Sequence, residues 1–325
     1  IKGVINMNTF KKIGLTALAS SLVVTSAVAG EMSVAGGASM GLKNTSKTSS
    51  GKSWTMGNQL TFTGGGELDN GLNVALSFIL DQGDDSTTTG TAHNKTSPFD
   101  SHSITLSRDD LGTLSFHPEG GSSAQAAIDT TAAGDLWDNG SGFGTPGASE
   151  GGNALVYTLP TIMDDLTLVG SYSPGGAGGG SATAYRIGYS GITGLSVDYG
   201  VGDTETVGSQ AETSTTKVSY AMEQFPLTVS ASQTKHDAVA ANSDEDVESW
   251  NVAYTVTDDL SVAYGVETHD TEGSNVDEEA EKLNVSYTTG GMTLSATQFN
   301  FEGSGNTAGA AGEKERWSLS ATFAF

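Results

Sequence analysis

One pattern of alternation, repeated along the chain, constrains its fold more than any other feature. The last copy covers residues 315–325 and reads ERWSLSATFAF, with tryptophan, leucine and phenylalanine on one parity and arginine, serine and threonine on the other. Successive side chains of a strand point to opposite faces, so each copy predicts a β-strand with one apolar and one polar face. Aromatic residues at both ends of an apolar stripe are typical of a strand that crosses a membrane.

The pattern recurs sixteen times. The predicted segments are residues 31–43, 54–63, 72–80, 104–106, 114–116, 155–159, 166–172, 185–189, 195–201, 218–222, 227–231, 250–256, 260–266, 283–287, 292–296 and 315–325. We expect each strand to span about 9–11 residues, enough to cross a bilayer when tilted. The connections are predicted to alternate strictly between a short turn and a longer polar loop, and this alternation with an even strand number indicates a transmembrane β-barrel.

Closure follows from the chemistry of the bilayer. Lipid offers no hydrogen bonds to the backbone, so a sheet within it must close on itself. Sixteen strands enclose a space too wide for side chains to fill, which predicts an all-β, antiparallel barrel around a water-filled channel. A secreted β-sandwich or solenoid adhesin is the alternative. It would pack Leu76, Val197, Tyr254 and Leu319 into a dry interior.

Composition excludes several other classes of protein. The chain of 325 residues carries a net charge of −24, and 16% of its residues are charged. A nucleic-acid partner needs a basic face, which this acidic chain does not offer. The absence of cysteine excludes disulfides, thiolate catalysis and cysteine-based metal sites.

The first residues are predicted to be a targeting segment. Met7 is the expected start, and residues 1–6 are interpreted as upstream read-through. Lys11 and Lys12 precede an apolar stretch over residues 13–28, and Ala27-Val28-Ala29 supplies a cleavage site. We therefore predict a signal peptide over residues 7–29, export from the cytoplasm, and one barrel domain over residues 30–325.

The longest interruption of the pattern runs from Glu119 to Gly152. Long loops without secondary structure are usually functional or disordered. Ile128, Leu136, Trp137 and Phe143 give this loop enough apolar surface to favour docking over solvation. Residues 123–128 are predicted as a possible short helix.

Strand number, loop alternation, the position of this loop and the closing WSLSATFAF give the chain a resemblance to the Gram-negative general porins, most of all to their alphaproteobacterial branch. The resemblance covers residues 31–325. It implies a homotrimer in the outer membrane, with the second long loop reaching a neighbouring subunit. It further implies that the third long loop folds into the lumen and opposes its acidic residues to basic residues of the wall. The terminal strand resembles the signal read by the barrel-assembly machinery, and the residues concerned are Trp317, Leu319, Phe323 and Phe325.

By position, the resemblance implies these acidic constriction residues: Glu119, Asp129, Asp135, Asp138 and Glu150. The polar parity of the strands predicts these charged or titratable residues on the lumen wall: Lys43, Arg186, Lys217, Lys282, Arg316, His117 and Asp198. Arg108 has the outward parity at a turn and is interpreted as a rim residue. The basic residues are spread around the predicted barrel without a tight arginine ladder, which is a departure from the family.

Two acidic runs invite a metal hypothesis. Asp244 and Asp246 lie in one predicted loop, and Asp277 and Glu278 lie in the next. Carboxylates suit Ca²⁺, so a weak calcium site is one interpretation and a solvated face is the other. No other cofactor is expected.

Signals for an enzyme are poor. The five histidines show no H-x-x-x-H spacing. A barrel lipase would need a serine–histidine pair on the outer surface, and His102 has no convincing serine partner in the sequence. We therefore expect no enzymatic activity.

The expected function is passive diffusion of ions and small hydrophilic solutes through the channel. Two unit charges about 10 Å apart in water interact by about 0.4 kcal/mol, and physiological salt screens them over about 8 Å. A surplus of acids therefore predicts only a weak preference for cations. A substrate-specific porin is the runner-up, and an adhesive surface protein is the alternative from another class.

Overall fold

The computed structural model describes residues 31–45, 51–81, 99–119, 121–129, 131–134, 136, 147–149, 152–175, 180–206 and 209–325, with the backbone alone described at positions 31, 45, 81, 99, 100, 119, 206 and 209. The predicted read-through and signal peptide lie outside these residues. Among the residues described, no helix is long and apolar enough to cross a membrane.

The described residues form sixteen strands and a short 3-10 helix, η3 (Gly309–Ala311). The strands are β1 (Glu31–Thr45), β2 (Gly51–Glu67), β3 (Asn73–Asp81), β4 (Phe99–Arg108), β5 (Gly112–Glu119), β6 (Ala154–Thr158), β7 (Leu166–Ser173), β8 (Ala182–Ile192), β9 (Leu195–Thr206), β10 (Ser209–Ala221), β11 (Leu227–Asp237), β12 (Glu245–Thr255), β13 (Leu260–Thr271), β14 (Glu278–Thr289), β15 (Met292–Glu302) and β16 (Lys314–Ala324). Each strand pairs with its sequence neighbours, and every pairing is antiparallel.

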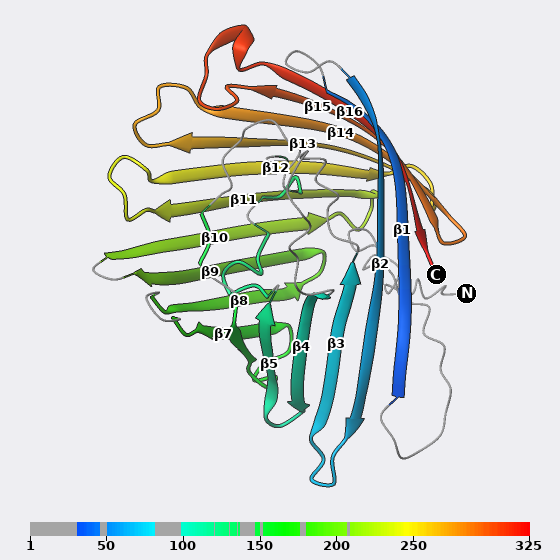
Figure 1. The fold of residues 1–325 in the computed structure, drawn as a ribbon, viewed down its shortest axis with the longest axis vertical. Helices are drawn as coiled ribbons and strands as arrows, with labels where there is room; N and C mark the ends of the chain where they lie inside the picture. The colour runs from blue at the N-terminus through cyan, green and yellow to red at the C-terminus, as the bar shows by residue number, and fades with distance from the viewer. Residues whose placement is uncertain are drawn as a thin grey trace, which may run out of the picture.

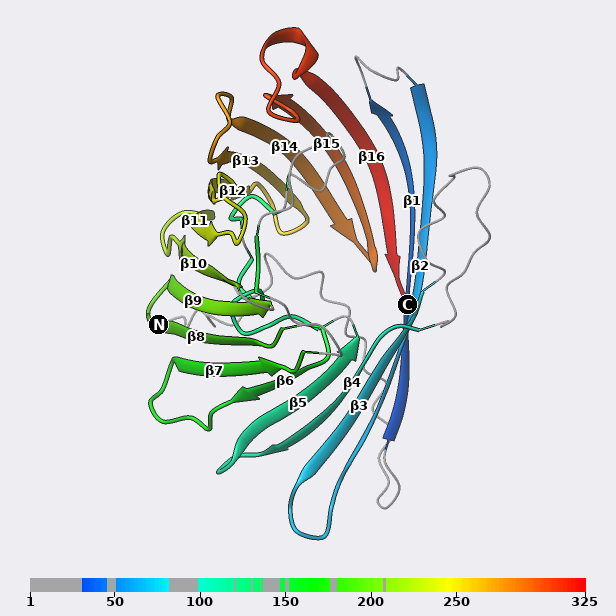
Figure 2. The same ribbon diagram turned by 60° about the vertical axis from the view of Figure 1, so that its left-hand side comes forward.

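The sheet closes where β1 meets β16 (Figures 1 and 2). The seam runs in register from Gly37 opposite Ala324 to Thr45 opposite Arg316. Beyond it, the amide of Gly36 donates to the carbonyl of Phe325 at 2.6 Å, and the amide of Phe325 donates back at 3.0 Å. The predicted sixteen-stranded antiparallel barrel is confirmed, and its ladder has no free edge.

The apolar stripes face away from the barrel axis. Leu76, Tyr254 and Leu319 are 44%, 45% and 51% exposed, respectively, so they do not pack into a dry core. Phe62 and Phe78 stack on the same outer face across β2 and β3, with ring centroids 4.7 Å apart. The secreted sandwich alternative is therefore wrong, because its apolar parity would be buried.

The predicted strand lengths and loop lengths need correction. β1 has 15 residues and β2 has 17, whereas β6 has 5. The stretch between Val201 and Val218, expected to be a long polar loop, continues β9 as far as Thr206 and is taken up by β10 from Ser209. Strict alternation in connection length is thus wrong. A strand continues beyond its apolar stripe because the ladder joins backbone groups, whatever the side chains.

The turn between β2 and β3 is tight. Leu68 and Leu72 flank the Asp69-Asn70-Gly71 turn between β2 and β3, and the amide of Leu68 donates to the carbonyl of Leu72 at 2.8 Å. Gly71 has a φ of 77°, a conformation that a side chain disfavours. Turns of this kind hold adjacent strands in register and so set which residues share a face.

Candidate functional site

The described residues of the connection between β5 and β6 lie on the concave side of the sheet, within the barrel (Figures 1 and 2). Residues 121–129, 131–134, 136 and 147–149 of it are described. Its first part forms consecutive turns, in which the amide of Ala127 donates to the carbonyl of Ser123 at 2.9 Å. The short helix suggested for residues 123–128 does not form there. We call these described residues the inner segment.

The start and the exit of the inner segment are tied to each other. The hydroxyls of Ser123 and Ser149 are 2.6 Å apart, and the amide of Ser149 donates to Oε1 of Gln125 at 2.9 Å. The same glutamine reaches the wall, because its Nε2 donates to Oγ1 of Thr215 on β10 at 2.8 Å. The amide of Ala124 donates to Oγ of Ser171 on β7 at 2.8 Å. The two ends of the long connection therefore meet at the wall.

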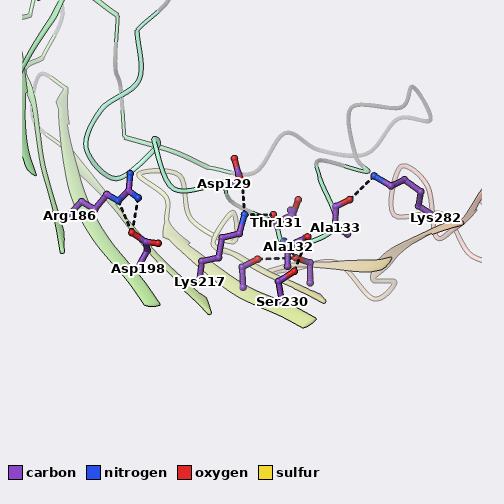
Figure 3. A network of polar contacts seen from close by, with 11 residues as sticks. Asp129, Thr131, Ala132, Ala133, Arg186, Asp198, Lys217, Ser230 and Lys282 are labelled. Atoms are coloured by element: carbon purple, nitrogen blue, oxygen red, sulfur yellow. Dashed lines mark hydrogen bonds and ion pairs between the residues drawn. The ribbon is translucent and has the colours of Figure 1, made fainter. Parts of the chain in front are cut away.

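The middle of the inner segment meets two lysines of the wall (Figure 3). Nζ of Lys217 lies 2.5 Å from Oδ2 of Asp129 and donates to the carbonyl of Thr131 at 3.3 Å. Nζ of Lys282 on β14 donates to the carbonyl of Ala133 at 2.7 Å. Both lysines were predicted to face the lumen, and both reach the inner segment from there.

An apolar seat receives the farther part of the inner segment. Leu136 is fully buried against Ala133 of the segment and Ala280, Phe299 and Phe301 of the wall. Sequence reasoning missed this seat. The signal was present, because the two phenylalanines occupy the polar parity of β15, where hydroxyl residues were expected.

A buried carboxylate also binds the inner segment at Leu136. Oε2 of Glu267 on β13 accepts the amide of Leu136 at 3.0 Å, and Oε1 lies 2.6 Å from Nε2 of His269. Glu267 is 0% and His269 is 4% exposed. Acceptance of a backbone N–H by a carboxylate is a strong hydrogen bond in such a shielded place.

Two glycines allow the inner segment to lie directly on the wall. A Cβ at Gly200 on β9 would stand 2.8 Å from Cδ1 of Ile128 and 3.0 Å from Cα of Gln125. A Cβ at Gly265 on β13 would stand 2.6 Å from Cβ of Ala133. Larger residues at these positions would force the segment away from the strands.

The basic wall residues fall into two groups. Arg186 on β8 is paired with Asp198 on β9, with Nη2 and Oδ1 at 2.7 Å, and Lys217 is paired with Asp129. Phe299 on β15 pairs with Lys282 on β14 on one side and with Arg316 on β16 on the other. The guanidinium of Arg316 stands 5.7 Å from the centroid of the Phe299 ring.

Lys43 completes the second group. It lies on β1 opposite Ser318, two residues along β16 from Arg316. The group spans four adjacent strands and borders the apolar seat. Arg316, Lys43 and Lys282 are all half-buried on the inner face.

The predicted constriction acids are only partly placed. Asp129 belongs to the inner segment, and its side chain is 70% exposed. The backbone of Glu119 pairs with His102 beyond an irregularity between β4 and β5. Asp135, Asp138 and Glu150 lie outside the described residues. His117 pairs with the buried Ala154 of β6, on the inner face.

Comparison with known proteins decides the family. A family model described as Gram-negative porin matches residues 14–301. This chain belongs to the Gram-negative porin family. No curated protein matches it significantly in sequence.

Solved structures share the fold of this porin. An anion-selective porin from Comamonas acidovorans is 14% identical, with 91% of this chain and 100% of that chain covered and a TM-score of 0.69. A porin refined at 1.8 Å resolution is 17% identical with a TM-score of 0.68, over 91% and 100% of the two chains. The outer-membrane protein OmpT of Vibrio cholerae is 14% identical over 93% and 100%, with a TM-score of 0.67. Porins are outer-membrane channel proteins and not enzymes, and this porin is one of them.

At the turn between β4 and β5, the porin carries an ion pair. Nε of Arg108 lies 2.5 Å from Oδ1 of Asp110, and Nη1 reaches the carbonyl of Asn70 at 3.5 Å. The hydrogen bond from Arg108 lowers the pKa of Asp110 below its ordinary value. The sequence placed Arg108 at the rim, and the structure places it beside a turn.

The acids named for calcium lie at the starts of β12 and β14 or directly before them, and β13 separates these two strands. Asp244 accepts the amide of Ala238 at 2.8 Å, and Asp246 accepts Nε2 of Gln233 at 3.0 Å. Glu278 is 2% exposed and accepts the amide of Gly305 at 2.7 Å. Within the described ranges, no three acidic or histidine side chains gather as a metal site would require. Calcium binding at Asp244, Asp246, Asp277 and Glu278 stays a prediction.

The residues named for the assembly signal lie on the outer face of β16 or directly beyond it. Leu319 and Phe325 are 51% and 70% exposed, and Phe323 is 37% exposed. Trp317 lies on the same parity, with Nζ of Lys52 at 5.9 Å from its ring centroid. The ring of Phe325 covers Gly36 so closely that a Cβ there would collide with it. Recognition by the assembly machinery stays a prediction.

Proposed function

We propose that this porin is a general diffusion channel of the outer membrane, narrowed by the inner segment and weakly selective for cations. One observation carries the proposal: a chain segment is bonded to the inner face of a closed barrel on β7, β10 and β13. A sixteen-stranded barrel is too wide to exclude small solutes by itself. The segment reduces that width, so size becomes the main limit on passage.

Weak selectivity follows from how the lumen charges are arranged. Asp129 and Asp198 each stand beside a cation, and the pairs Lys217–Asp129 and Arg186–Asp198 contribute little net field. Charges of opposite sign at such short range cancel at the distance of a passing ion. The net charge of −24 over the whole chain then favours cations modestly. The relative from Comamonas acidovorans is named anion-selective, so charge preference is a point on which the two proteins would differ.

We further propose a homotrimer, anchored through the outer face of β1 and β2. Met40 and Met56 are opposite each other there, and Trp54 lies two pairs along, opposite Leu42. Trp54 and Met56 are 75% and 78% exposed, whereas Tyr254 and Leu283 elsewhere on the apolar band are 45% and 47% exposed. Large, accessible apolar side chains of this kind suit contact with another subunit. Outer-membrane lipid would cover the remaining apolar band, and the barrel-assembly machinery would insert the chain.

Planar-bilayer recording tests the proposed function. The expected result is large stepwise openings in groups of three, with a weak cation preference and no block by any single solute. Block by one sugar or anion at low concentration would instead support a substrate-specific porin. A protein that inserts and never conducts would contradict the proposal in both forms.

Deletion of residues 124–147 tests the role of the inner segment. The expected result is a larger single-channel conductance, because the lumen loses the chain that narrows it. The control is a check that the deletion variant still forms a barrel. A folded barrel changes its electrophoretic mobility on heating, and the variant should show the same change. A folded barrel with unchanged conductance would contradict the role of the segment.

A further inference from the structure

A groove with a volume of about 550 Å³ lies on the outer face of the barrel, over β10–β13. At its centre is Ala231 on β11, whose neighbours across the ladder are the larger Val218 on β10 and Trp250 on β12. All three have the outward parity and are exposed. Because the side chain of alanine is a single methyl group, the outer surface dips along β11 between its two neighbours.

One end of this outer groove is apolar. Val218, Trp250 and Val266 line it, and the ring centroids of Trp250 and Tyr264 are 5.5 Å apart. Below Trp250 on β12, the outward residues continue the apolar band as far as Tyr254. Tryptophan in a membrane protein is typical of the level where acyl chains give way to headgroups. The apolar end of the groove therefore opens onto the acyl chains of the bilayer.

The other end of the outer groove is polar and finishes at Glu248. Its Oε1 accepts Nε2 of Gln233 at 3.1 Å, and the same Nε2 donates to Asp246 at 3.0 Å. Lys235 is paired with Asp246, at 3.5 Å. Among the described residues, none forms an ion pair with Glu248 or a hydrogen bond with its Oε2. The groove thus ends at a carboxylate that has an amide donor and no cationic partner within the described part of the chain.

The surroundings of the polar end are acidic. The structure describes β12, β13 and β14 in full, and their outward residues at this end of the barrel include a group of carboxylates: Asp246, Glu248, Asp270, Glu279 and Glu281. On the outward parity of β11–β14, Lys235 is the one cationic side chain of these four described strands. A lipid headgroup with net negative charge is repelled by such a surface, whereas an ammonium group is attracted.

We propose that the outer groove binds one membrane lipid whose headgroup carries an ammonium group. An acyl chain lies over Ala231, between Val218 and Trp250, and the ammonium group donates to Glu248. The groove is continuous with the apolar band of a transmembrane barrel, so acyl chains have direct access to it. A charge-assisted hydrogen bond to Glu248 then selects the headgroup. The proposal concerns the outer face and does not depend on conduction through the lumen.

Native mass spectrometry of the folded barrel in detergent tests the lipid class. The probes are phosphatidylethanolamine and phosphatidylglycerol with identical acyl chains. We expect phosphatidylethanolamine to bind about tenfold more tightly, because lipid shields the ammonium–carboxylate contact from water. Equal affinities, or tighter binding of phosphatidylglycerol, would overturn the assignment of the headgroup.

Two variants test the place of binding. Ala231→Phe fills the groove and should weaken binding of phosphatidylethanolamine at least about tenfold, because the chain loses its buried contacts. Glu248→Gln keeps the shape of the groove and should remove most of the preference between the two lipids. The shift in electrophoretic mobility on heating verifies that each variant forms a barrel.

Matched controls lie on the outer face beyond the groove. Ala296→Phe on β15 fills a small position between Val285 and Leu319, and Glu302→Gln removes an outward carboxylate from the end of the same strand. Neither should change the affinity or the preference.

Two outcomes would overturn the site itself. One is an equal effect of Ala231→Phe and Ala296→Phe on binding. The other is dissociation of the oligomer by Ala231→Phe with lipid binding unchanged, which would show that another subunit covers the groove. A barrel that conducts in planar bilayers as expected and shows no lipid preference would refute the lipid site alone. A barrel that shows the preference and never conducts would refute the proposed diffusion function alone.

Discussion

At the scale of single residues, glycines on the inner face report how closely the inner segment approaches the wall. Gly200 lies under Gln125 and Ile128, whereas a Cβ at Gly37 on β1 would meet only the carbonyl of Phe323, at 3.8 Å. The two glycines have the same parity and similar positions within long strands. They differ in what covers them, so they make a matched pair.

Gly200→Val should clearly lower the single-channel conductance, because the side chain pushes the backbone of the inner segment at Gln125 off the wall and into the lumen. Overfilling a packed site of this kind costs about 1–3 kcal/mol. Gly37→Val should lower the conductance only slightly, because its methyl groups enter open space. Single-channel recording of both variants compares the two decreases. Equal decreases would contradict the placement of the segment.

The ion pair at the turn after β4 gives a prediction about protonation. Arg108→Gln removes the hydrogen bond that lowers the pKa of Asp110, so that pKa should rise towards the ordinary aspartate value of about 3.9. A lowered pKa in the folded state stabilises the protein above the unfolded pKa. That contribution is lost as the pH falls through the folded pKa. Titration of the Asp110 carboxyl carbon by NMR in detergent micelles measures the shift, and an unchanged pKa would exclude Arg108 as its cause.

At the scale of elements, the inner segment is held by an apolar seat as well as by hydrogen bonds. Leu136 is 0% exposed in a lumen that is otherwise wet, so its burial contributes about 1.5–3 kcal/mol to docking. Phe299 and Phe301 stack with ring centroids 5.9 Å apart and form the floor of the seat. The element that narrows the channel therefore depends on two aromatic residues of a strand far away in sequence.

Leu136→Ala should loosen the inner segment and leave the barrel closed. Truncating a fully buried leucine typically costs about 2–5 kcal/mol, and here that cost falls on docking. We expect more current noise in the open channel and faster proteolysis of the long connection. Leu283→Ala, on the outer face of β14, is the matched control and should change neither measurement. If neither variant changes the current noise or the rate of proteolysis, the seat does not hold the segment.

The sequence predicted the barrel better than it predicted the site, for a physical reason. Alternation has a period of two along every strand, so Leu319 and Tyr254 reveal their outward face without any tertiary contact. The site instead depends on which strands the inner segment crosses. Nothing near Glu267 in sequence indicates that its carboxylate accepts the amide of Leu136, because the barrel alone brings these residues together.

Register is a second property that the sequence does not give. It places Lys282 and Arg316 on either side of Phe299. The stretch from Val201 to Val218 was interpreted as a loop because it lacks an apolar stripe. It forms strands because cross-strand hydrogen bonds do not require one.

At the scale of the whole molecule, the effect of the net charge on ion selectivity depends on the salt concentration of the solvent. The chain carries −24 charges, and the Debye length falls from about 30 Å at 0.01 M salt to about 3 Å at 1 M. Cation preference should therefore be clear in dilute potassium chloride and should nearly vanish in concentrated solution. Reversal potentials under a fixed concentration ratio at both ionic strengths check this. A preference independent of salt would point to a local binding site rather than to the overall field.

The seam between β1 and β16 has a consequence for biogenesis. Residues near position 40 find their partners near position 320, so the ladder stays incomplete while a ribosome is still working on the chain. Until then the strand that begins the barrel keeps an unsatisfied edge, which is a template for aggregation. The topology therefore leaves β1 able to pair with another chain until its own last strand has been made.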